Sequence, residues 1–409
     1  MSSVVRRDKA VEQTSTKINL YDAVVVGGGM VGAATAIGLG QLGLKVAIVE
    51  AFAPKAYDSE QPLDLRVSAI SAASEALLER LGALAGLDGM RKVAYKGLET
   101  WEMDGCITRF HSDQIGSSHL GHILENRLIQ LSLWQRMEQL DNITLFCPTK
   151  IAKLSRSSTQ EQITVELDSG ELFMTRLLVG ADGANSMVRQ WANIGITGWD
   201  YGQSAMLINI ETASEEQDVT WQQFTPSGPR SLLPLPGNHA SLVWYDDANK
   251  IAQLSQLNNL ALKAQIDQYF PERLERDFQV INKASFKLTR RHAQVYYRDN
   301  LVILGDAAHT INPLAGQGVN LGFKDVDALV NTIASHIDDE KGWWHSQVLE
   351  KYQKCRYRDN QLMMSTMDLF YASFSNDILP LKILRNGVLK LANIDGPIKK
   401  QVLKYAMGF

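Results

Sequence analysis

The pattern of apolar and polar residues near the N-terminus predicts a strand, a helix and a second strand in close succession. An apolar run in 21–26 is followed by three glycines, and a helix is expected from Met30 to Leu42, with Gly43 ending it. A second apolar run follows and ends in Glu50. This order is typical of a parallel β-α-β unit.

Further along the chain, helical and strand-like patterns alternate. Apolar residues at helical spacing predict helices over 74–90, 125–140 and 258–275, and most of 319–409 is also expected to be helical. Alternation over 163–178 predicts a hairpin that turns at 168–170. The β-branched and aromatic content of 203–245 predicts an antiparallel sheet, which we expect to cover a substrate cavity.

The glycine spacing of the first unit is that of a dinucleotide-binding turn. Gly27 permits the tight turn, Gly29 lets backbone N–H groups approach a pyrophosphate, and Gly32 lets the helix lie close to the sheet. The phosphates would lie at the positive end of the helix. Glu50 stands where a carboxylate can accept hydrogen bonds from ribose hydroxyls. The motif alone does not choose between NAD and FAD, and a tight turn without a ligand is the alternative.

Two later motifs favour FAD, and each follows a buried apolar strand. The first reads Leu-Leu-Val-Gly-Ala-Asp-Gly over 177–183 and contains Asp182. The second, within 300–322, places Gly305 and Asp306 directly after the strand and then continues through a loop. That loop ends in Gly-Gln-Gly at 316–318, where a helix is expected to begin.

With these three motifs in this order, the chain resembles the group A FAD-dependent aromatic hydroxylases, of which para-hydroxybenzoate hydroxylase is the best-known type. The stretches that are most similar to the hydroxylases of ubiquinone biosynthesis are 64–71, 220–224, 288–292 and 305–322. The resemblance covers nearly the whole chain. It implies an α/β fold in which a Rossmann-type FAD domain is interleaved with a mixed or antiparallel-sheet substrate domain and followed by a helical C-terminus.

The expected division of the chain is therefore discontinuous. A flexible tail is expected at 1–20. The FAD-binding domain is expected to comprise 21–95, 120–195 and 300–335. The substrate domain is expected to comprise 96–119 and 196–299, with a C-terminal helical region over 336–409.

The resemblance implies a monooxygenase that uses FAD, NAD(P)H and O2 to hydroxylate a polyprenylated benzoquinol ring through a flavin C4a-hydroperoxide. A paralogous hydroxylase that acts at another ring position would share all three motifs. A flavin-linked reductase without oxygen insertion is a second alternative, and a flavin-containing structural subunit of a biosynthetic assembly is a third. Other ubiquinone-biosynthesis proteins are possible partners.

Family members use residues at matching positions to bind the cofactor. Asp306 is expected to bind the ribityl hydroxyls, Arg66 to reach the FAD phosphates, and Asp182 to lie near the cofactor and influence its reduction. A turn cap, a surface salt bridge and a plain turn aspartate are the respective alternatives. His309 is expected near the flavin, either in local hydrogen bonding or in proton transfer.

The environment of the flavin ring is expected to come from Pro313, Gly316, Gln317 and Gly318. The helix that starts near Gly318 would point its positive end at the flavin and favour negative charge there. Pro313 lacks an N–H, so it can shape the wall over the ring without competing for hydrogen bonds.

There is no second dinucleotide motif, so NAD(P)H is expected to dock transiently in a surface groove. The neighbouring residues Arg290, Arg291 and His292 either bind its phosphates or form a solvated basic patch.

Composition limits the remaining possibilities. The chain of 409 residues suits two joined domains, and its net charge of −4 argues against nucleic-acid binding. Cys106, Cys147 and Cys355 are far apart, so we expect reduced thiols and no metal site. No apolar stretch approaches the roughly 20 residues that cross a bilayer.

The C-terminal segment 378–409 carries six basic side chains against a single acid, Asp395. Its helical pattern places four apolar residues on one face, namely Leu381, Leu384, Val388 and Leu391. Such a helix either lies on an anionic membrane surface or packs against the protein's own core. Because a polyprenyl substrate resides in the bilayer, we expect a cytoplasmic protein in peripheral contact with the inner face of the membrane.

Overall fold

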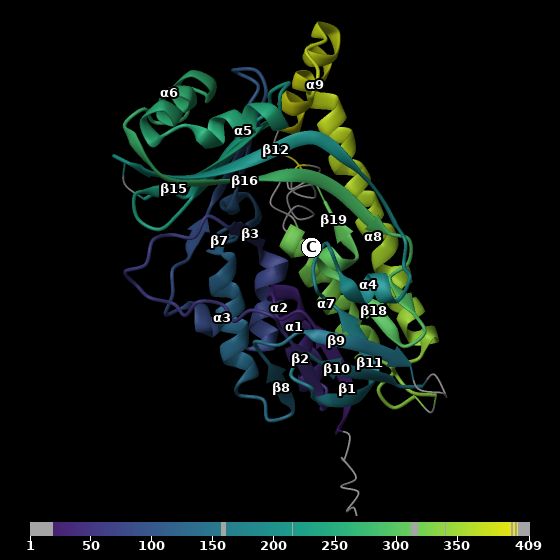
Figure 1. Ribbon diagram of the computed structural model, residues 1–409. Coiled ribbons are helices and arrows are strands. Elements are labelled where there is room, and N and C mark those ends of the chain that lie inside the picture. The colour runs from purple at the N-terminus through teal and green to yellow at the C-terminus, as the bar shows by residue number, and fades with distance from the viewer. Residues whose placement is uncertain are drawn as a thin grey trace, which may run out of the picture.

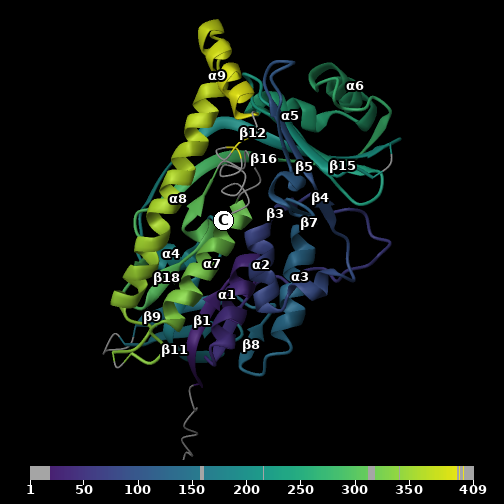
Figure 2. The ribbon, with the colours of Figure 1, turned by 180° about the vertical axis from the view of Figure 1, so that it is seen from behind.

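The computed structural model of the protein describes residues 19–156, 161–214, 216–311, 318–339, 341–393, 396 and 399. Two large β-sheets lie one above the other, and a long helix runs along their side (Figure 1). The same helix is seen from behind in Figure 2, where it leads up to a shorter helix at the top.

The first sheet is built around parallel strands, and its central strands are largely buried on both faces. Its order is β17-β18-β11-β1-β2-β8. The parallel strands are β1 (Asn19–Val26), β2 (Val46–Val49), β8 (Ile143–Phe146), β11 (Leu172–Gly180) and β18 (Leu301–Ile303). The antiparallel additions are β9 (Ile151–Arg156), β10 (Ile163–Leu167) and β17 (Tyr297–Arg298). The hairpin expected over 163–178 is confirmed as β10 and the first part of β11.

Helices α1 (Met30–Gln41), α2 (Ala72–Leu81), α3 (Asn126–Met137) and α7 (Gly318–Ala334) pack together on this sheet. The predicted first helix is confirmed, and its residues from Gly32 to Gly40 are all buried. The helix predicted over 74–90 extends well beyond the end of the observed helix α2, at Leu81. Gly82 adopts a left-handed conformation with φ of 76°, which ends α2, and a short 3-10 turn follows at Leu84–Leu87.

The second sheet follows the order β19-β16-β12-β15-β14-β13-β5-β6 and is mainly antiparallel. Its strands are β5 (Gly97–Trp101), β6 (Thr108–His111), β12 (Ile196–Thr212), β13 (Val219–Gln223), β14 (Arg230–Pro234), β15 (His239–Asp247), β16 (Phe278–Ala293) and β19 (His309–Thr310). The antiparallel sheet expected in 203–245 is confirmed.

Two helices cover the outer face of the second sheet, α5 (Ala248–Gln256) and α6 (Asn259–Tyr269) (Figure 1). The helix expected over 258–275 ends earlier, at Tyr269. Phe270 is extended because it precedes Pro271, and a residue before proline disfavours the helical conformation.

A third sheet of three strands, β3 (Val67–Ser71), β7 (Gly121–Glu125) and β4 (Val93–Tyr95), lies between the two large sheets. The C-terminal part contains α8 (Ser346–Phe374) and α9 (Leu379–Ala392), which confirms the helical prediction within the described residues. None of the described helices combines the length and apolar character that crossing a membrane requires.

Candidate functional site

The carboxyl ends of four neighbouring parallel strands meet at one edge of the first sheet. In the register of this sheet, Val26 of β1 pairs with Val49 of β2 and with Gly180 of β11, and Gly180 pairs with Ile303 of β18. The loops that follow these strands carry all three sequence motifs. Ligands of open α/β sheets bind at this edge, so the fold brings the predicted cofactor residues together.

The glycine turn after β1 is crowded on two sides and open on a third. Gly27 has φ of 100°, and a Cβ added there would lie 2.4 Å from the carbonyl oxygen of Ala181. A Cβ on Gly32 would lie 1.9 Å from the carbonyl oxygen of Gly27. By contrast, a Cβ on Gly29 would meet no described atom within 4 Å. This open side at the start of α1 fits an approaching pyrophosphate.

Side chains from two other elements hold this turn in place. The Glu50 carboxylate accepts hydrogen bonds from the backbone N–H groups of Gly28, at 2.6 Å, and of Phe52, at 3.0 Å. The Gly28 carbonyl accepts hydrogen bonds from Gln130 Nε2 and Trp134 Nε1 of α3, both at 2.8 Å. Gln130 and Trp134 were not identified from the sequence, although their spacing of four residues places them on one face of the predicted helix.

The Gly-Asp motif lies close to the glycine turn and to Arg66. Gly305 has φ of 59°, and a Cβ added there would lie 3.1 Å from Cγ1 of Val31 in α1. The Asp306 side chain is exposed, yet desolvation by surrounding protein raises its pKa, an effect that the charges of His309 and Arg66 oppose. The Asp306 carboxylate therefore lies close enough to Arg66 for their charges to interact.

His309 is fixed in a buried ion-pair network. Its Nε2 lies 2.5 Å from Oδ2 of Asp325, and the same oxygen accepts the backbone N–H of Gly305 at 3.0 Å. Arg356 of α8 donates from Nε to Oδ1 of Asp325 at 2.8 Å. Burial alone would raise the pKa of Asp325, but His309 and Arg356 more than offset it and hold that pKa well below its usual range. The geometry of His309 thus fits local hydrogen bonding rather than a free base.

This network continues into the second sheet. Asn360 donates to Asp325 Oδ1 and to the Tyr296 hydroxyl, each at 3.1 Å, and the Tyr296 hydroxyl lies 2.8 Å from Nε2 of His292. Burial lowers the pKa of His292 to about 4, and the nearby charges of His309 and Arg290 add to the effect. His292 is therefore neutral and enclosed at neutral pH.

The solvated basic patch is wrong as an account of the Arg-Arg-His stretch, because His292 is buried and the Arg290 side chain is only 12% exposed, whereas the binding of NAD(P)H phosphates stays a prediction. Besides the enclosed His292, Arg290 pairs with Asp368 at 3.1 Å and lies over the ring of Trp199 at 4.1 Å. Arg291 donates to the Asn185 side chain at 2.9 Å. The stretch is a structural junction between β16 and its neighbours.

The Asp-Gly motif is braced by its own short helix, α4 (Met187–Trp191). Oδ2 of Asp182 accepts the backbone N–H of Val188 at 3.1 Å, whereas Oδ1 is buried and has no partner among the described residues. Burial raises the pKa of Asp182, and hydrogen bonds from Ser186 and the α4 backbone oppose this rise. A buried carboxylate oxygen with an unused acceptor site beside the glycine turn can receive a donor from a bound cofactor.

Arg189 links the Asp-Gly motif to the Gly-Asp motif. Its buried guanidinium donates from Nη1 to the Ala307 carbonyl at 2.8 Å and from Nη2 to the Ala184 carbonyl at 2.9 Å. The sequence shows Arg189 at helical spacing from Ser186, but no local signal indicates that it reaches Ala307.

Helix α7 begins at Gly318 close to this edge of the first sheet. Asn320 in its first turn accepts hydrogen bonds from the Ser71 backbone N–H at 3.0 Å and from the Ser74 hydroxyl at 2.8 Å. A Cβ on Gly318 would meet no described atom within 4 Å. The other residues expected around the flavin ring, Pro313, Gly316 and Gln317, lie outside the described residues.

The C-terminal helix α9 turns its apolar residues toward solvent, unlike a helix that packs against a core. Its predicted apolar stripe is exposed, with Leu384 at 66% and Leu391 at 67% of full exposure. Arg385, which we expected among the free basic side chains, is buried instead. Its Nε donates to Glu102 at 2.8 Å, and Asn386 donates to the same carboxylate at 2.6 Å. The stripe therefore does not pack against the described core.

Comparison with known proteins agrees with this geometry. The model of the FAD binding domain family matches residues 20–366. The chain is 45% identical to the 3-demethoxyubiquinol 3-hydroxylase of Escherichia coli over 387 residues, which cover 95% of this chain and 98% of that protein. It is 31% identical to the human mitochondrial ubiquinone biosynthesis monooxygenase COQ6, with 95% of this chain and 92% of that protein covered.

Solved structures confirm the predicted fold class. The p-nitrophenol 4-monooxygenase PnpA of Pseudomonas putida superimposes with a TM-score of 0.78 at 17% identity, covering 95% of this chain and 99% of that one. The HpxO protein of Klebsiella pneumoniae, in complex with FAD and uric acid, superimposes with a TM-score of 0.70 at 15% identity, covering 95% and 96%. From the matched family model and the two curated relatives, the chain belongs to the FAD-dependent monooxygenase family that includes the hydroxylases of ubiquinone biosynthesis.

Proposed function

We propose that this protein hydroxylates the ring of a polyprenylated benzoquinol in ubiquinone biosynthesis, using FAD, NAD(P)H and O2. The convergence of three motif loops around the open side of Gly29 carries the proposal, because it provides one place for the whole cofactor. The similarity to the 3-demethoxyubiquinol 3-hydroxylase of Escherichia coli supports 2-polyprenyl-3-methyl-6-methoxy-1,4-benzoquinol as the substrate class. The similarity to COQ6 keeps a paralogous hydroxylase with another ring position as the second candidate.

The proposed cofactor contacts follow from the positions of the side chains. The turn of Gly27, Gly29 and Gly32 receives the pyrophosphate at the start of α1. Glu50 accepts the ribose hydroxyls, since an ionised carboxylate offers about four acceptor positions and two are used by Gly28 and Phe52.

The remaining proposed contacts lie along the Gly-Asp and Asp-Gly loops. Asp306 accepts the ribityl hydroxyls, and Arg66, whose charge acts on Asp306, supplies positive charge to the phosphates. Gly305 allows the close approach of its loop. Asp182 contributes its buried, unused oxygen near the cofactor, and His309 positions the loop through Asp325.

FAD supplies the activation of O2 when it is bound, and the protein supplies the surroundings of the ring. The start of α7 at Gly318 favours negative charge at the flavin edge, because the first N–H groups of a helix and its dipole give that end a partial positive charge. Pro313, Gly316 and Gln317 are proposed to complete the wall over the ring. The predicted division of the chain into an FAD-binding domain, a substrate domain and a C-terminal helical region is also part of this proposal.

Peripheral membrane contact is a further part of the proposal. As the contact surface we propose the exposed apolar residues of the C-terminal helices, namely Leu362, Leu369, Phe370, Ile378, Leu379, Leu381, Ile383, Leu384, Val388 and Leu391, and call it the apolar face. The ion pair between Arg385 and Glu102 holds α9 with this face outward. A bilayer that contains the lipid substrate is the occupant that this face fits, and other proteins of the pathway are the competing occupants.

The function is tested by turnover of the purified holoenzyme with a short-tailed benzoquinol and isotopically labelled O2. The expected product carries one labelled oxygen on the ring, with consumption of NAD(P)H. Oxidation of NAD(P)H without labelled product would indicate a reductase, and label at another ring position would indicate the paralogous activity. Bound FAD without any turnover would favour a structural subunit.

Membrane contact is tested by vesicle co-sedimentation. The double variant Leu384→Ser, Leu391→Ser should bind anionic vesicles at least about tenfold more weakly, since burying one leucine contributes roughly 1.5–3 kcal/mol. Leu260→Ser is the matched control, because Leu260 is 82% exposed on α6, away from this face. Equal binding of all three proteins would refute membrane contact by α9.

A further inference from the structure

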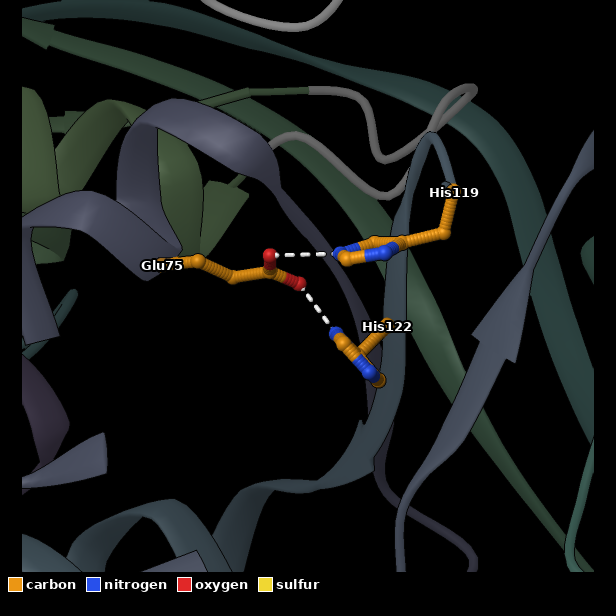
Figure 3. Close-up of side chains that lie close together, drawn as sticks. All are labelled: Glu75, His119 and His122. Atoms are coloured by element: carbon orange, nitrogen blue, oxygen red, sulfur yellow. Dashed lines mark hydrogen bonds and ion pairs between the residues drawn. The ribbon is translucent and has the colours of Figure 1, made fainter. Parts of the chain in front are cut away.

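A cluster of two histidines and one glutamate lies outside the cofactor loops (Figure 3). Glu75 comes from α2, His119 from the segment before β7, and His122 from β7 itself. Oε2 of Glu75 lies 3.0 Å from Nε2 of His119, and Oε1 hydrogen-bonds with Nδ1 of His122. One candidate ligand atom from each residue lies within 4.8 Å of the other two.

We propose that Glu75, His119 and His122 form a binding site for a divalent transition-metal ion of the Zn²⁺ class. Two imidazole nitrogens and one carboxylate oxygen, with water in the fourth position, form an established ligand set for Zn²⁺. Nitrogen and carboxylate ligands together favour Zn²⁺, Co²⁺ or Ni²⁺ over Mg²⁺ and Ca²⁺, which prefer oxygen alone.

The spacing of the ligand atoms suits such an ion. With metal–ligand distances of about 2.0–2.1 Å, tetrahedral ligand atoms lie about 3.4 Å apart. The carboxylate oxygen and the His119 nitrogen, now 3.0 Å apart, need to separate by only a few tenths of an ångström.

The side chains are also held in the way that metal ligands are held. Nδ1 of His119 lies 2.8 Å from the Ser118 hydroxyl, so a ring bound to metal through Nε2 would donate its other N–H to that oxygen. His122 lies in the central strand of the third sheet, where it pairs with Ile70 and Ala94 on either side. The three side chains are only 13–26% exposed.

The charge of the cluster leaves room for a cation. Within the described residues, the ion-pair partners of Glu75 are the two imidazoles, so no lysine or arginine there occupies the carboxylate. A bound divalent ion would offset this buried negative charge.

A metal at this position would connect two parts of the molecule. It would join β7 and the preceding segment to α2, whose N-terminus is already tied to the first turn of α7 through Asn320. Binding of the ion would therefore make the contact between the third sheet and α7 more rigid.

The test uses FAD-loaded protein stripped of metal and equilibrium dialysis against Zn²⁺. Wild type should bind about one ion per chain, whereas Glu75→Gln and His122→Asn should each lose at least about 100-fold in affinity. His111→Asn is the matched control, because His111 is a half-exposed histidine paired with Asp113 and lies outside the cluster. Unchanged binding by the Glu75 and His122 variants, or no binding by wild type, would overturn the proposal.

X-ray absorption of the Zn²⁺-loaded wild type keeps the proposal testable even where a variant fails to fold. The expected spectrum contains nitrogen and oxygen neighbours at about 2.0–2.1 Å with the scattering pattern of two imidazoles. Sulfur neighbours at about 2.3 Å would place the ion on the cysteines instead and would refute this site.

Discussion

Gly29→Ala separates cofactor binding from folding at the glycine turn. The added methyl would meet no described protein atom within 4 Å, and Gly29 has an extended backbone with φ of −67° that alanine readily adopts. Its folding cost is therefore limited to the poorer N-cap of α1, which is about 1 kcal/mol. The methyl would, however, occupy the space through which the pyrophosphate approaches the helix.

The expected loss of FAD affinity follows from the hydrogen bonds that this displacement breaks. A hydrogen bond to a charged group contributes roughly 1.5–3 kcal/mol. If the phosphate moves out of reach of two backbone N–H groups, the loss is about 3–6 kcal/mol, or roughly two to four powers of ten in Kd.

Flavin titration of the apoprotein, followed by quenching of FAD fluorescence, measures this loss directly. Gly32→Ala serves as a contrasting variant, because its Cβ would lie 1.9 Å from the Gly27 carbonyl oxygen and would disturb the fold itself. We expect Gly29→Ala to unfold in urea nearly as wild type does and Gly32→Ala to be clearly destabilised. Wild-type FAD affinity in Gly29→Ala would refute the placement of the pyrophosphate at this turn.

Three further predictions concern buried and recessed charges. Asp306→Ala should weaken FAD binding by about tenfold or more without destabilising the apoprotein, because the carboxylate is desolvated there; an unchanged Kd in the same titration would contradict its role. Asp325→Ala should lower the free energy of unfolding by roughly 3–5 kcal/mol, since it leaves Arg356 and His309 without their buried counter-charge. A loss under about 1 kcal/mol in urea unfolding would show that the network is dispensable. For His292, the folded pKa of about 4 lies below the unfolded value of about 6.5, so the unfolded chain binds more protons between these values and stability falls as the pH is lowered from about 6.5 toward 4. His292→Gln should flatten this dependence of Tm between pH 4.5 and 7, and an identical slope in the variant would assign it to other groups.

The sequence predicted the parts of the site that depend on local signals. Gly27, Gly29 and Gly32 follow directly from one strand and begin one helix, so the strand, turn and helix can be recognised within a few residues, while the contacts of these glycines with a cofactor stay a prediction. The two over-long helices were errors of the same local kind. Gly82 directly after Leu81 and Pro271 directly after Phe270 are standard stop signals that the apolar periodicity outweighed in our prediction.

The contacts that the sequence did not reveal are all long-range. Asp325 and Arg356 lie in two different helices and are 31 residues apart in the sequence. Gly305 lies 20 residues before Asp325. Glu75 and His122 are 47 residues apart, and no local pattern in the sequence joins them. The outward orientation of α9 depends on Arg385 and Glu102, which are separated by 283 residues, whereas helical periodicity reveals a face but not which side of the protein it meets.

One physical requirement connects these unforeseen contacts. A loop that must keep one side open for a cofactor cannot be fixed by apolar packing on that side, so it has to be held from the protein side by directed hydrogen bonds. The carbonyl of Gly28 is held by Gln130 and Trp134, and the carbonyl of Ala307 is held by Arg189. The N–H of Gly305 is held in the same way by Asp325. Buried and partly buried side chains thus fix the loop backbones, and the opposite side, marked by the open position at Gly29, is left open for the proposed FAD site.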